Sequence, residues 1–187
     1  MTLFRTLEIP GCVEIDCTHH ADERGCFVKC FQQSEFAAAG LETAFVEHYY
    51  SKSVAGVVRG LHLQLPPDDH AKLVYCVSGE VWDVCLDVRV GSPTFGASVA
   101  LPLSAARHNA IYIPRGVAHG FCVERGEATL VYSVTSLHSP SRDSGVRWDS
   151  VGIRWPIVAP TVSKRDAQLP RWEAFESPFR WVGGERT

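Results

Sequence analysis

Glycine and proline residues divide this chain into many short segments rich in β-branched and aromatic residues, and this spacing restricts the possible folds most strongly. The 187 residues include 15 glycines and 11 prolines, with no low-complexity stretch and no repeat. Short β-rich segments separated by turn residues are typical of sandwiches and barrels. The sequence therefore predicts an all-β fold, namely a jelly-roll barrel of about seven to ten strands with a few short helices.

The clearest local pattern predicts a β-hairpin. Lys72–Val77 and Glu80–Asp87 are both rich in β-branched and aromatic residues, and only Ser78 and Gly79 separate them. A connection this short that contains glycine suits a tight turn between antiparallel strands. Further strands are expected at residues 97–103, 109–113, 118–123 and 128–135.

Two short helical segments are expected among the strands. Ser34–Ala39 starts with a residue that can cap a helix and is followed by Gly40, and a second turn or two is expected after Ser163. The end of the chain carries many aromatic and proline residues: Pro170, Trp172, Phe175, Pro178, Phe179 and Trp181. We therefore expect residues 163–187 to pack back on the barrel or on a partner subunit.

Size, charge and cysteine content favour a soluble cytoplasmic enzyme or binding protein. A chain of 187 residues can bury roughly 70% of its unfolded surface in one core, so residues 1–187 are expected to form a single domain. The net charge of −3 provides no basic field for nucleic acid. We expect no membrane segment, because no run approaches about 18 apolar residues, and we also expect no signal segment, because no basic-then-apolar stretch is present near residue 1. The seven cysteines form no Cys-x-x-Cys pair and are expected to be buried, reduced thiols.

A group of basic residues marks the candidate site. Arg59 and His62 lie in the segment Arg59-Gly60-Leu61-His62-Leu63-Gln64, and Lys72 follows at the start of the next predicted strand. Imidazole suits proton abstraction because its pKa lies near neutral pH, and cations suit an anionic, oxygen-rich substrate. A hydrogen-bonded interior histidine is the alternative for His62. Because uncompensated cations are seldom buried without a role, the group as a whole favours function.

Four other residues admit both a functional and a structural interpretation. His119 in Pro-x-Gly-x-x-His and Tyr132 in an alternating strand pattern can face the inside of a barrel, either as reactive groups or as packing. Asp166 has the position of an ordinary carboxylate at a helix start. Arg24 lies in a turn and is the strongest anion-binding side chain of the first forty residues.

The chain closely resembles the dTDP-4-dehydrorhamnose 3,5-epimerase family of nucleotide-sugar enzymes from about residue 10 to residue 170. The resemblance rests on long motifs in a fixed order: Asp22-x-Arg24-Gly25-x-Phe27, Ser51-x-Ser53-x-x-Gly56-Val57-Val58-Arg59-Gly60-Leu61-His62-x-Gln64, Lys72-Leu73-Val74, Gly79-Glu80-Val81-x-Asp83-Val84, Asp87-x-Arg89-x-x-Ser92-Pro93-Thr94-Phe95-Gly96, Ile113-Pro114-x-Gly116-x-Ala118-His119-Gly120-Phe121 and Gly145-Val146-x-Trp148-Asp149. The first and the later histidine motif also resemble those of cupin barrels, with Gln64 and Lys72 where a metal site needs ligands. The resemblance implies a jelly-roll barrel that uses neither metal nor other cofactor.

The family resemblance also implies roles for individual residues. It implies His62 as the general base supported by Asp166, Tyr132 as the acid or base on the opposite sugar face, and Lys72 as the group that stabilises the oxyanion. Arg59 and His119 would bind substrate, and Arg24 would reach the site from a neighbouring subunit of a homodimer. The remaining expected substrate-binding residues are Phe27, Lys29, Glu47, Tyr49, Gln64, His138, Asp143 and Arg165.

The departures from the family pattern concern the nucleotide end of the expected pocket. Lys29 stands where the family usually has glutamate, and His138 where it has the tyrosine that stacks on the base. Glu47-His48-Tyr49 replaces Gln-x-Asn. Asp143 replaces glutamate and Arg165 replaces lysine. The reaction class is therefore predicted more firmly than the nucleobase.

These observations predict a metal-independent epimerase that inverts C3, C5 or both in a nucleotide-linked 4-keto-6-deoxyhexose, with dTDP as the carrier that the family implies. The alternatives are an epimerase for one position or a 3,4-ketoisomerase, acting on a CDP- or GDP-sugar. A barrel that binds a nucleotide sugar without catalysis is an alternative from another class. A metal-dependent cupin dioxygenase is disfavoured by Gln64 and Lys72.

Overall fold

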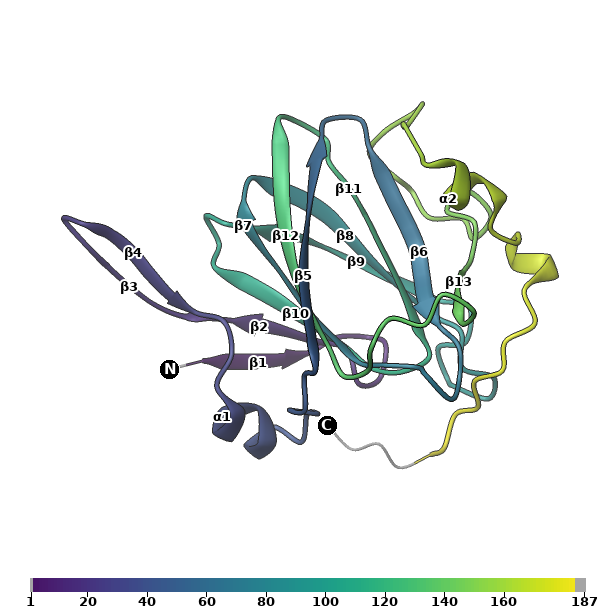
Figure 1. Cartoon of the computed structure of the whole chain (residues 1–187), viewed down its shortest axis with the longest axis horizontal. Helices are drawn as coiled ribbons and strands as arrows, with labels where there is room; N and C mark the ends of the chain where they lie inside the picture. The colour runs from purple at the N-terminus through teal and green to yellow at the C-terminus, as the bar shows by residue number, and fades with distance from the viewer. Residues whose placement is uncertain (1, 184–187) are drawn as a thin grey trace.

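Two antiparallel sheets face each other in the computed structural model, which describes residues 2–183 (Figure 1). The first sheet has the order β1 (Leu3–Thr6), β2 (Val13–Asp16), β10 (Asn109–Ile113), β7 (Lys72–Ser78), β12 (Glu127–Val134) and β5 (Glu47–Val54). The second has the order β13 (Asp143–Gly145), β6 (Val58–Gln64), β11 (Val117–Cys122), β8 (Glu80–Asp87) and β9 (Ser98–Ser104). With the hairpin described below, the described residues form more strands than the seven to ten expected, and the all-β jelly-roll prediction is confirmed.

The strands on either side of Ser78 and Gly79 do not form the predicted hairpin. β7 pairs with β10 and β12, whereas β8 pairs with β11 and β9, so the turn carries the chain from one sheet to the other. The apolar side chains of β7 and β8, such as Val74 and Val81, meet across the main core cluster. The prediction was wrong because alternation specifies strands and their buried face, but not which neighbour supplies the ladder hydrogen bonds.

Both short helices lie close to their predicted positions, but only the second has the predicted capping residue. α1 is Gln33–Ala38, one residue earlier than expected, because the carbonyl of Gln32 accepts from the N–H groups of Glu35 and Phe36. The predicted Ser34 cap is therefore wrong. α2, Lys164–Gln168, is capped as expected, since the Ser163 hydroxyl accepts from the backbone N–H of Asp166.

A separate hairpin, made of β3 (Thr18–Asp22) and β4 (Gly25–Lys29), forms a small sheet of its own. Figure 1 shows this arm extending away from the two main sheets. It carries three of the predicted substrate-binding residues, Arg24, Phe27 and Lys29. Their side chains are exposed, and Arg24 forms an ion pair with Asp22 at 2.6 Å.

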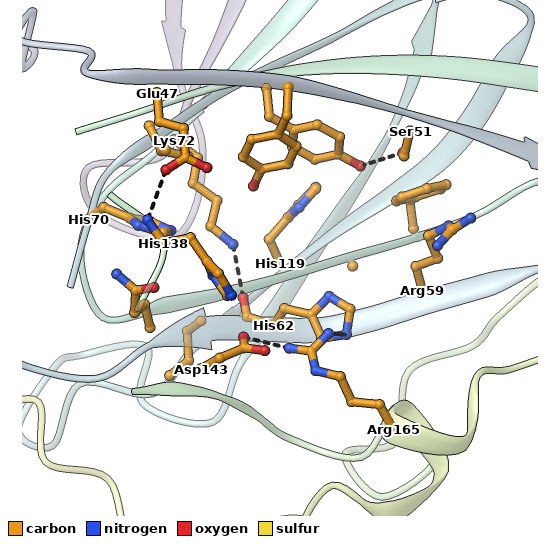
Figure 2. Close-up of a pocket in the computed structure, with 17 residues that line it drawn as sticks. Glu47, Ser51, Arg59, His62, His70, Lys72, His119, His138, Asp143 and Arg165 are labelled. Carbon is orange, nitrogen blue, oxygen red and sulfur yellow. Dashed lines mark hydrogen bonds and ion pairs between the residues drawn. The ribbon is translucent and has the colours of Figure 1, made fainter. Parts of the chain in front are cut away.

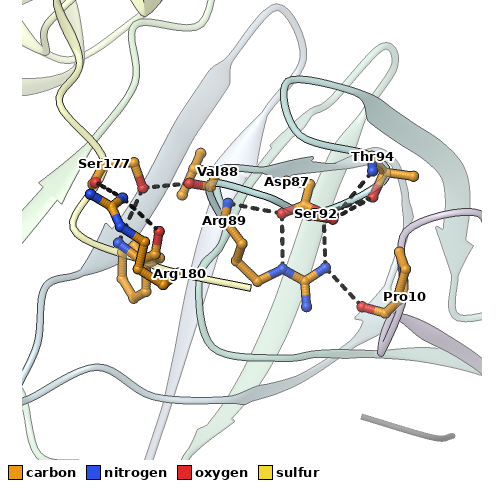
Figure 3. A network of polar contacts seen from close by, with 9 residues as sticks. Pro10, Asp87, Val88, Arg89, Ser92, Thr94, Ser177 and Arg180 are labelled. Atoms are coloured by element: carbon orange, nitrogen blue, oxygen red, sulfur yellow. Dashed lines mark hydrogen bonds and ion pairs between the residues drawn. The ribbon is translucent and has the colours of Figure 1, made fainter. Parts of the chain in front are cut away.

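The C-terminal segment contacts the barrel beside a polar network around Arg89, where the Ser177 hydroxyl donates to the Val88 carbonyl (Figure 3). The Asp87 carboxylate accepts hydrogen bonds from the Arg89 guanidinium. The central carbon of that guanidinium lies 4.5 Å from the centre of the Trp181 ring. Phe179 is buried, and η1 (Trp172–Ala174) brings the Trp172 ring against Phe95. The tail thus contacts its own chain as far as Trp181, and residues 184–187 of the predicted segment lie outside the described residues.

The cysteine prediction holds only in part. All seven cysteines are free thiols, as expected, and five are buried, but Cys30 is half-buried and Cys26, on the β3–β4 arm, is exposed. Among residues 2–183, no helix is both long and apolar enough to cross a membrane.

Strands β6 and β11 approach each other closely at two glycines. A Cβ atom on Gly60 would lie 2.5 Å from the Cα of Gly120, and Gly60 has a φ of +123°. In the other direction, a Cβ on Gly120 would lie 2.7 Å from the carbonyl oxygen of Arg59. Both contacts involve backbone, which cannot swing aside, so these positions require glycine.

Replacing Gly60 with alanine is expected to lower the free energy of unfolding by about 3 kcal/mol, because the methyl group adds backbone strain and a clash. Urea unfolding measures this change. The matched control is Gly126→Ala, where φ is +65° but nothing lies within 4 Å of the added Cβ; there we expect a loss of about 1 kcal/mol. Equal losses in the two variants would show that the close approach contributes nothing.

Candidate active site

A cavity of about 380 Å³ lies between the two sheets and is lined by residues of β5, β6, β7, β11 and β12 (Figure 2). Most of the residues predicted for the site line it: Glu47, Tyr49, Arg59, His62, Gln64, Lys72, His119, Tyr132, His138, Asp143 and Arg165. Asp166 contacts the cavity through His62. Arg24, Phe27 and Lys29 are absent from the lining residues and lie on the β3–β4 arm.

His62 and Asp166 form an imidazole–carboxylate pair. Nε2 of His62 lies 2.8 Å from Oδ1 of Asp166, and the other carboxylate oxygen accepts the backbone N–H of Gly60. Burial would raise the pKa of Asp166, but the hydrogen bonds from His62, Gly60 and Ser163 lower it to about 2. Because the ionised carboxylate can only accept, Nε2 carries the proton of this bond and Nδ1 is the basic nitrogen of the neutral ring.

Lys72 supplies a buried ammonium group beside this pair. Its Nζ donates to the carbonyl oxygen of His62 at 3.1 Å, and the side chain comes from β7 on the opposite sheet. Burial is the main cause that lowers the pKa of Lys72 to about 8, against the raising effect of nearby anionic groups that include Asp143 and Asp83. A buried ammonium in this place can stabilise negative charge on a substrate oxygen.

Tyr132 lies on β12, in the sheet opposite His62, and its hydroxyl is 3.2 Å from the hydroxyl of Ser51. Its ring stacks on Tyr49 of β5, with centroids 4.8 Å apart. Burial raises the pKa of Tyr132 above its ordinary value, so the phenol is protonated at neutral pH. Ser51 was not among the predicted site residues, although its motif was noted. The register that places Tyr49 opposite Tyr132 was not predictable from either strand alone.

His119 forms a second imidazole–carboxylate pair, with Asp83. Nε2 of His119 lies 2.8 Å from Oδ2 of Asp83, and both side chains are buried. Asp83 is a site residue that the sequence reasoning missed. A signal was present, because Asp83 alternates with Val81 and Cys85 on the inward face of β8, where an acidic residue needs a partner.

The remaining cavity residues divide into two ends. At one end, where β5 finishes and β6 starts, the Arg59 guanidinium donates to the Ser53 hydroxyl at 2.9 Å. At the other end, Glu47 accepts the backbone N–H of His138 at 2.8 Å. The Gln64 amide is engaged with the loop of residues 136–139, donating to the Leu137 carbonyl and accepting from the Ser139 N–H. Gln64 therefore holds the loop that carries His138.

The search for a metal site among residues 2–183 finds no group of three or more histidine, cysteine or acidic side chains placed to bind an ion. His62 and His119 each use one nitrogen for a carboxylate. What converges on the cavity is a set of proton donors, proton acceptors and cations. A jelly-roll barrel with an imidazole–carboxylate pair on one wall and a phenol on the other has the site of a proton-transferring isomerase.

Comparison with known proteins identifies the family. The family model described as dTDP-4-dehydrorhamnose 3,5-epimerase matches residues 6–174. The Shigella flexneri protein of that name is 43% identical over 169 residues, which cover 89% of this chain and 93% of the relative. The chain belongs to the dTDP-4-dehydrorhamnose 3,5-epimerase family and is an isomerase, a carbohydrate epimerase.

Two solved structures show how closely the fold agrees. The crystal structure of a dTDP-6-deoxy-D-glucose-3,5-epimerase from Legionella pneumophila, in complex with dTDP-4-keto-L-rhamnose, is similar with a TM-score of 0.93 at 31% identity, over 98% of this chain and 100% of that chain. A 3′-monoepimerase from Streptomyces bikiniensis, in complex with dTDP-quinovose, has a TM-score of 0.85 at 34% identity, over 90% and 87% of the two chains. Both double and single epimerases are thus among the similar structures.

Proposed function

We propose that this enzyme inverts both C3 and C5 of a dTDP-linked 4-keto-6-deoxyhexose. The observation that carries the proposal is that His62 and Tyr132 line one cavity from opposite sheets. Inversion needs a proton taken from one face of the sugar and delivered to the other. The family model and the similarity to dTDP-sugar epimerases support the same substrate class.

The chemistry explains why the cavity contains these residue types. C3 and C5 both flank the C4 ketone, so removal of either proton leaves an enolate whose charge rests on the C4 oxygen. In this mechanism His62 takes the proton, Lys72 stabilises the oxyanion, and Tyr132 returns a proton to the opposite face. Arg59 and His119 bind the substrate. The Arg59 guanidinium suits the diphosphate, because guanidinium groups hold its oxygens in bidentate fashion.

Deuterium uptake tests the proposal and separates its alternatives. The enzyme is incubated with the dTDP-4-keto-6-deoxy sugar in deuterated water, and incorporation at C3 and C5 is followed separately by NMR. A double epimerase exchanges both positions. Exchange at C3 alone would instead match the monoepimerase among the similar structures, and the absence of exchange would support a barrel that only binds.

A thermal-shift panel of dTDP, UDP, CDP and GDP tests the carrier. A ligand present at 100 times its dissociation constant stabilises the folded state by about 2.7 kcal/mol. We expect this shift for dTDP at the lowest concentration of the four. A lower dissociation constant for CDP or GDP would contradict the dTDP assignment, and it would place the cause at Glu47 and His138.

We propose further that the enzyme acts as a homodimer in which the β3–β4 arm of one subunit completes the cavity of the other. Two features support this. Arg24 and Phe27 are not lining residues of their own cavity, although the family resemblance makes them substrate-binding residues. The outer face of the first sheet also exposes large apolar side chains, among them Tyr50 and Val77, as expected of an association surface.

Mixing two inactive variants tests the shared site. Arg24→Ala and His62→Asn each remove one component, and a hybrid dimer has one cavity with both components intact. After random exchange of subunits, we expect about a quarter of wild-type activity, because half of the dimers are hybrids with one working site. Recovery near zero, with exchange verified by native mass spectrometry, would show that each subunit uses its own Arg24.

The activity is expected to depend on pH in a bell-shaped manner. Burial is the main cause that lowers the pKa of His62 below its ordinary value, so the neutral base persists below pH 6.5. Lys72, whose pKa burial lowers to about 8, must be protonated, so activity falls as pH rises through about 8. Measurement of kcat/KM from pH 5 to 10 checks both limbs. A plateau that continues beyond pH 10 would contradict the role of Lys72.

A further inference from the structure

One nitrogen of His62 has two neighbours of opposite charge. Nε2 lies 2.8 Å from Oδ1 of Asp166 and 3.1 Å from Nη1 of Arg165. The third side of this triangle, from Nη1 of Arg165 to Oδ1 of Asp166, is 3.7 Å. Figure 2 shows the Arg165 guanidinium beside the His62 ring at the edge of the cavity.

Only one of these neighbours can form a good hydrogen bond with Nε2 at a time. Asp166 requires a proton on Nε2, whereas Arg165, which has only donors, requires a lone pair there. The pKa of Asp166, lowered to about 2, makes its carboxylate ionised at working pH, so the proton belongs on Nε2. The guanidinium then opposes any further positive charge on the ring, and its charge acts to lower the pKa of His62.

Arg165 is held in this position by Asp143. Nη2 of Arg165 donates to Oδ1 of Asp143 at 2.5 Å. Asp143 lies on β13, which pairs with β6 so that Asp143 is opposite Gln64 and Gly145 is opposite His62. The anchor of Arg165 is therefore part of the same sheet as the histidine.

We propose that Arg165 is a positioning residue of the His62–Asp166 pair, whose fixed charge offsets the carboxylate and keeps the imidazole neutral, with Nδ1 ready to accept a proton. This rests on the proposed role of His62 as the base. Without Arg165, Asp166 would favour the imidazolium form, which cannot take a proton from the sugar. The role differs from the substrate contact expected for Arg165 from the sequence.

The other titratable groups near the His62 ring are Lys72 and the His119–Asp83 pair. Lys72 of β7 donates to the His62 carbonyl, and its charge also lowers the pKa of His62. His119 of β11 lies opposite His62 in the sheet register and is paired with Asp83 of β8. Among these neighbours, Arg165 is the cation in contact with the ring nitrogen itself.

The test is an NMR titration of His62 in the full-length enzyme without substrate, with its signal assigned by its loss in His62→Asn. In Arg165→Gln we expect the pKa of His62 to rise by about 0.5 to 1 unit. The acid limb of kcat/KM should move to higher pH by the same amount. Arg165→Lys keeps the charge and should restore at least half of the shift. The matched control is Lys164→Gln, which removes an exposed cation from the same helix.

Each outcome has a distinct meaning. An unchanged His62 pKa in Arg165→Gln, or an equal shift in Lys164→Gln, would overturn the proposal. A rise in the NMR pKa with no movement of the pH–rate profile would support the role of Arg165 and contradict His62 as the base. Thermal unfolding of each variant verifies that the folded enzyme is being compared.

Discussion

His62→Asn is expected to lower kcat by about 10³-fold or more and to abolish deuterium uptake at both C3 and C5, because it removes the group proposed to take the proton. Asparagine retains polarity and approximate size, so the ring nitrogen is the main loss. Quantitative NMR of substrate and product in deuterated water measures both effects in one sample. Binding of dTDP, followed by calorimetry, should change by less than threefold.

His48→Asn is the matched control for this variant. His48 lies on β5 between cavity residues, and its Nδ1 bonds the Ser133 hydroxyl, but it is not among the cavity-lining residues. Its activity should stay within twofold of wild type. If His62→Asn still exchanged the C3 or C5 hydrogen at near wild-type rate, another group would be the base and the mechanism proposed above would be wrong.

Tyr132→Phe is expected to separate exchange from inversion. The variant removes only the phenolic oxygen and the contact with Ser51, so a stability loss of about 1 kcal/mol is expected. His62 can still remove a proton and return a deuteron to the same face, so uptake continues. Formation of the inverted product should fall by about 10²- to 10³-fold, because no acid remains on the other face.

The neighbouring phenol provides the comparison. Tyr49→Phe keeps the stack with the Tyr132 ring and removes a hydroxyl on the same wall of the cavity. We expect a loss of inversion at least tenfold smaller than in Tyr132→Phe. A larger loss in Tyr49→Phe than in Tyr132→Phe would assign the acid to Tyr49. Product stereochemistry is read from the vicinal proton coupling constants of the sugar.

The sequence predicted strands β7 to β12 well, set no limits for β1 to β6 or β13, and predicted the pairing poorly. β10 was predicted with its observed limits and β9, β11 and β12 to within one residue, because alternation and turn residues are local signals. The pairing of β7 with β10 and β12 depends on contacts between distant segments, which a single strand pattern does not encode. The spacing of the turn residues predicted the jelly-roll barrel, and the family resemblance implied the same fold.

For the candidate site, too, residues with a local signal were predicted, whereas contacts between distant segments were not. His62, Lys72 and Tyr132 were recognised by residue type and motif, and they line one cavity. Asp83 was missed because a carboxylate within a strand has no local partner to indicate its role. The engagement of the Gln64 amide with the loop of residues 136–139 was also unforeseen, since both its donor and its acceptor contacts cross more than 70 positions of sequence.

The carboxylate paired with His62, the proposed base, comes from α2, which belongs to neither sheet and follows every strand of both sheets in the chain. A ribosome therefore completes the walls of the cavity before it adds Asp166. A nascent or prematurely terminated polypeptide carries the imidazole without the partner that orients it. Under the proposed mechanism, His62 therefore gains its carboxylate partner only after every strand of both sheets has been made.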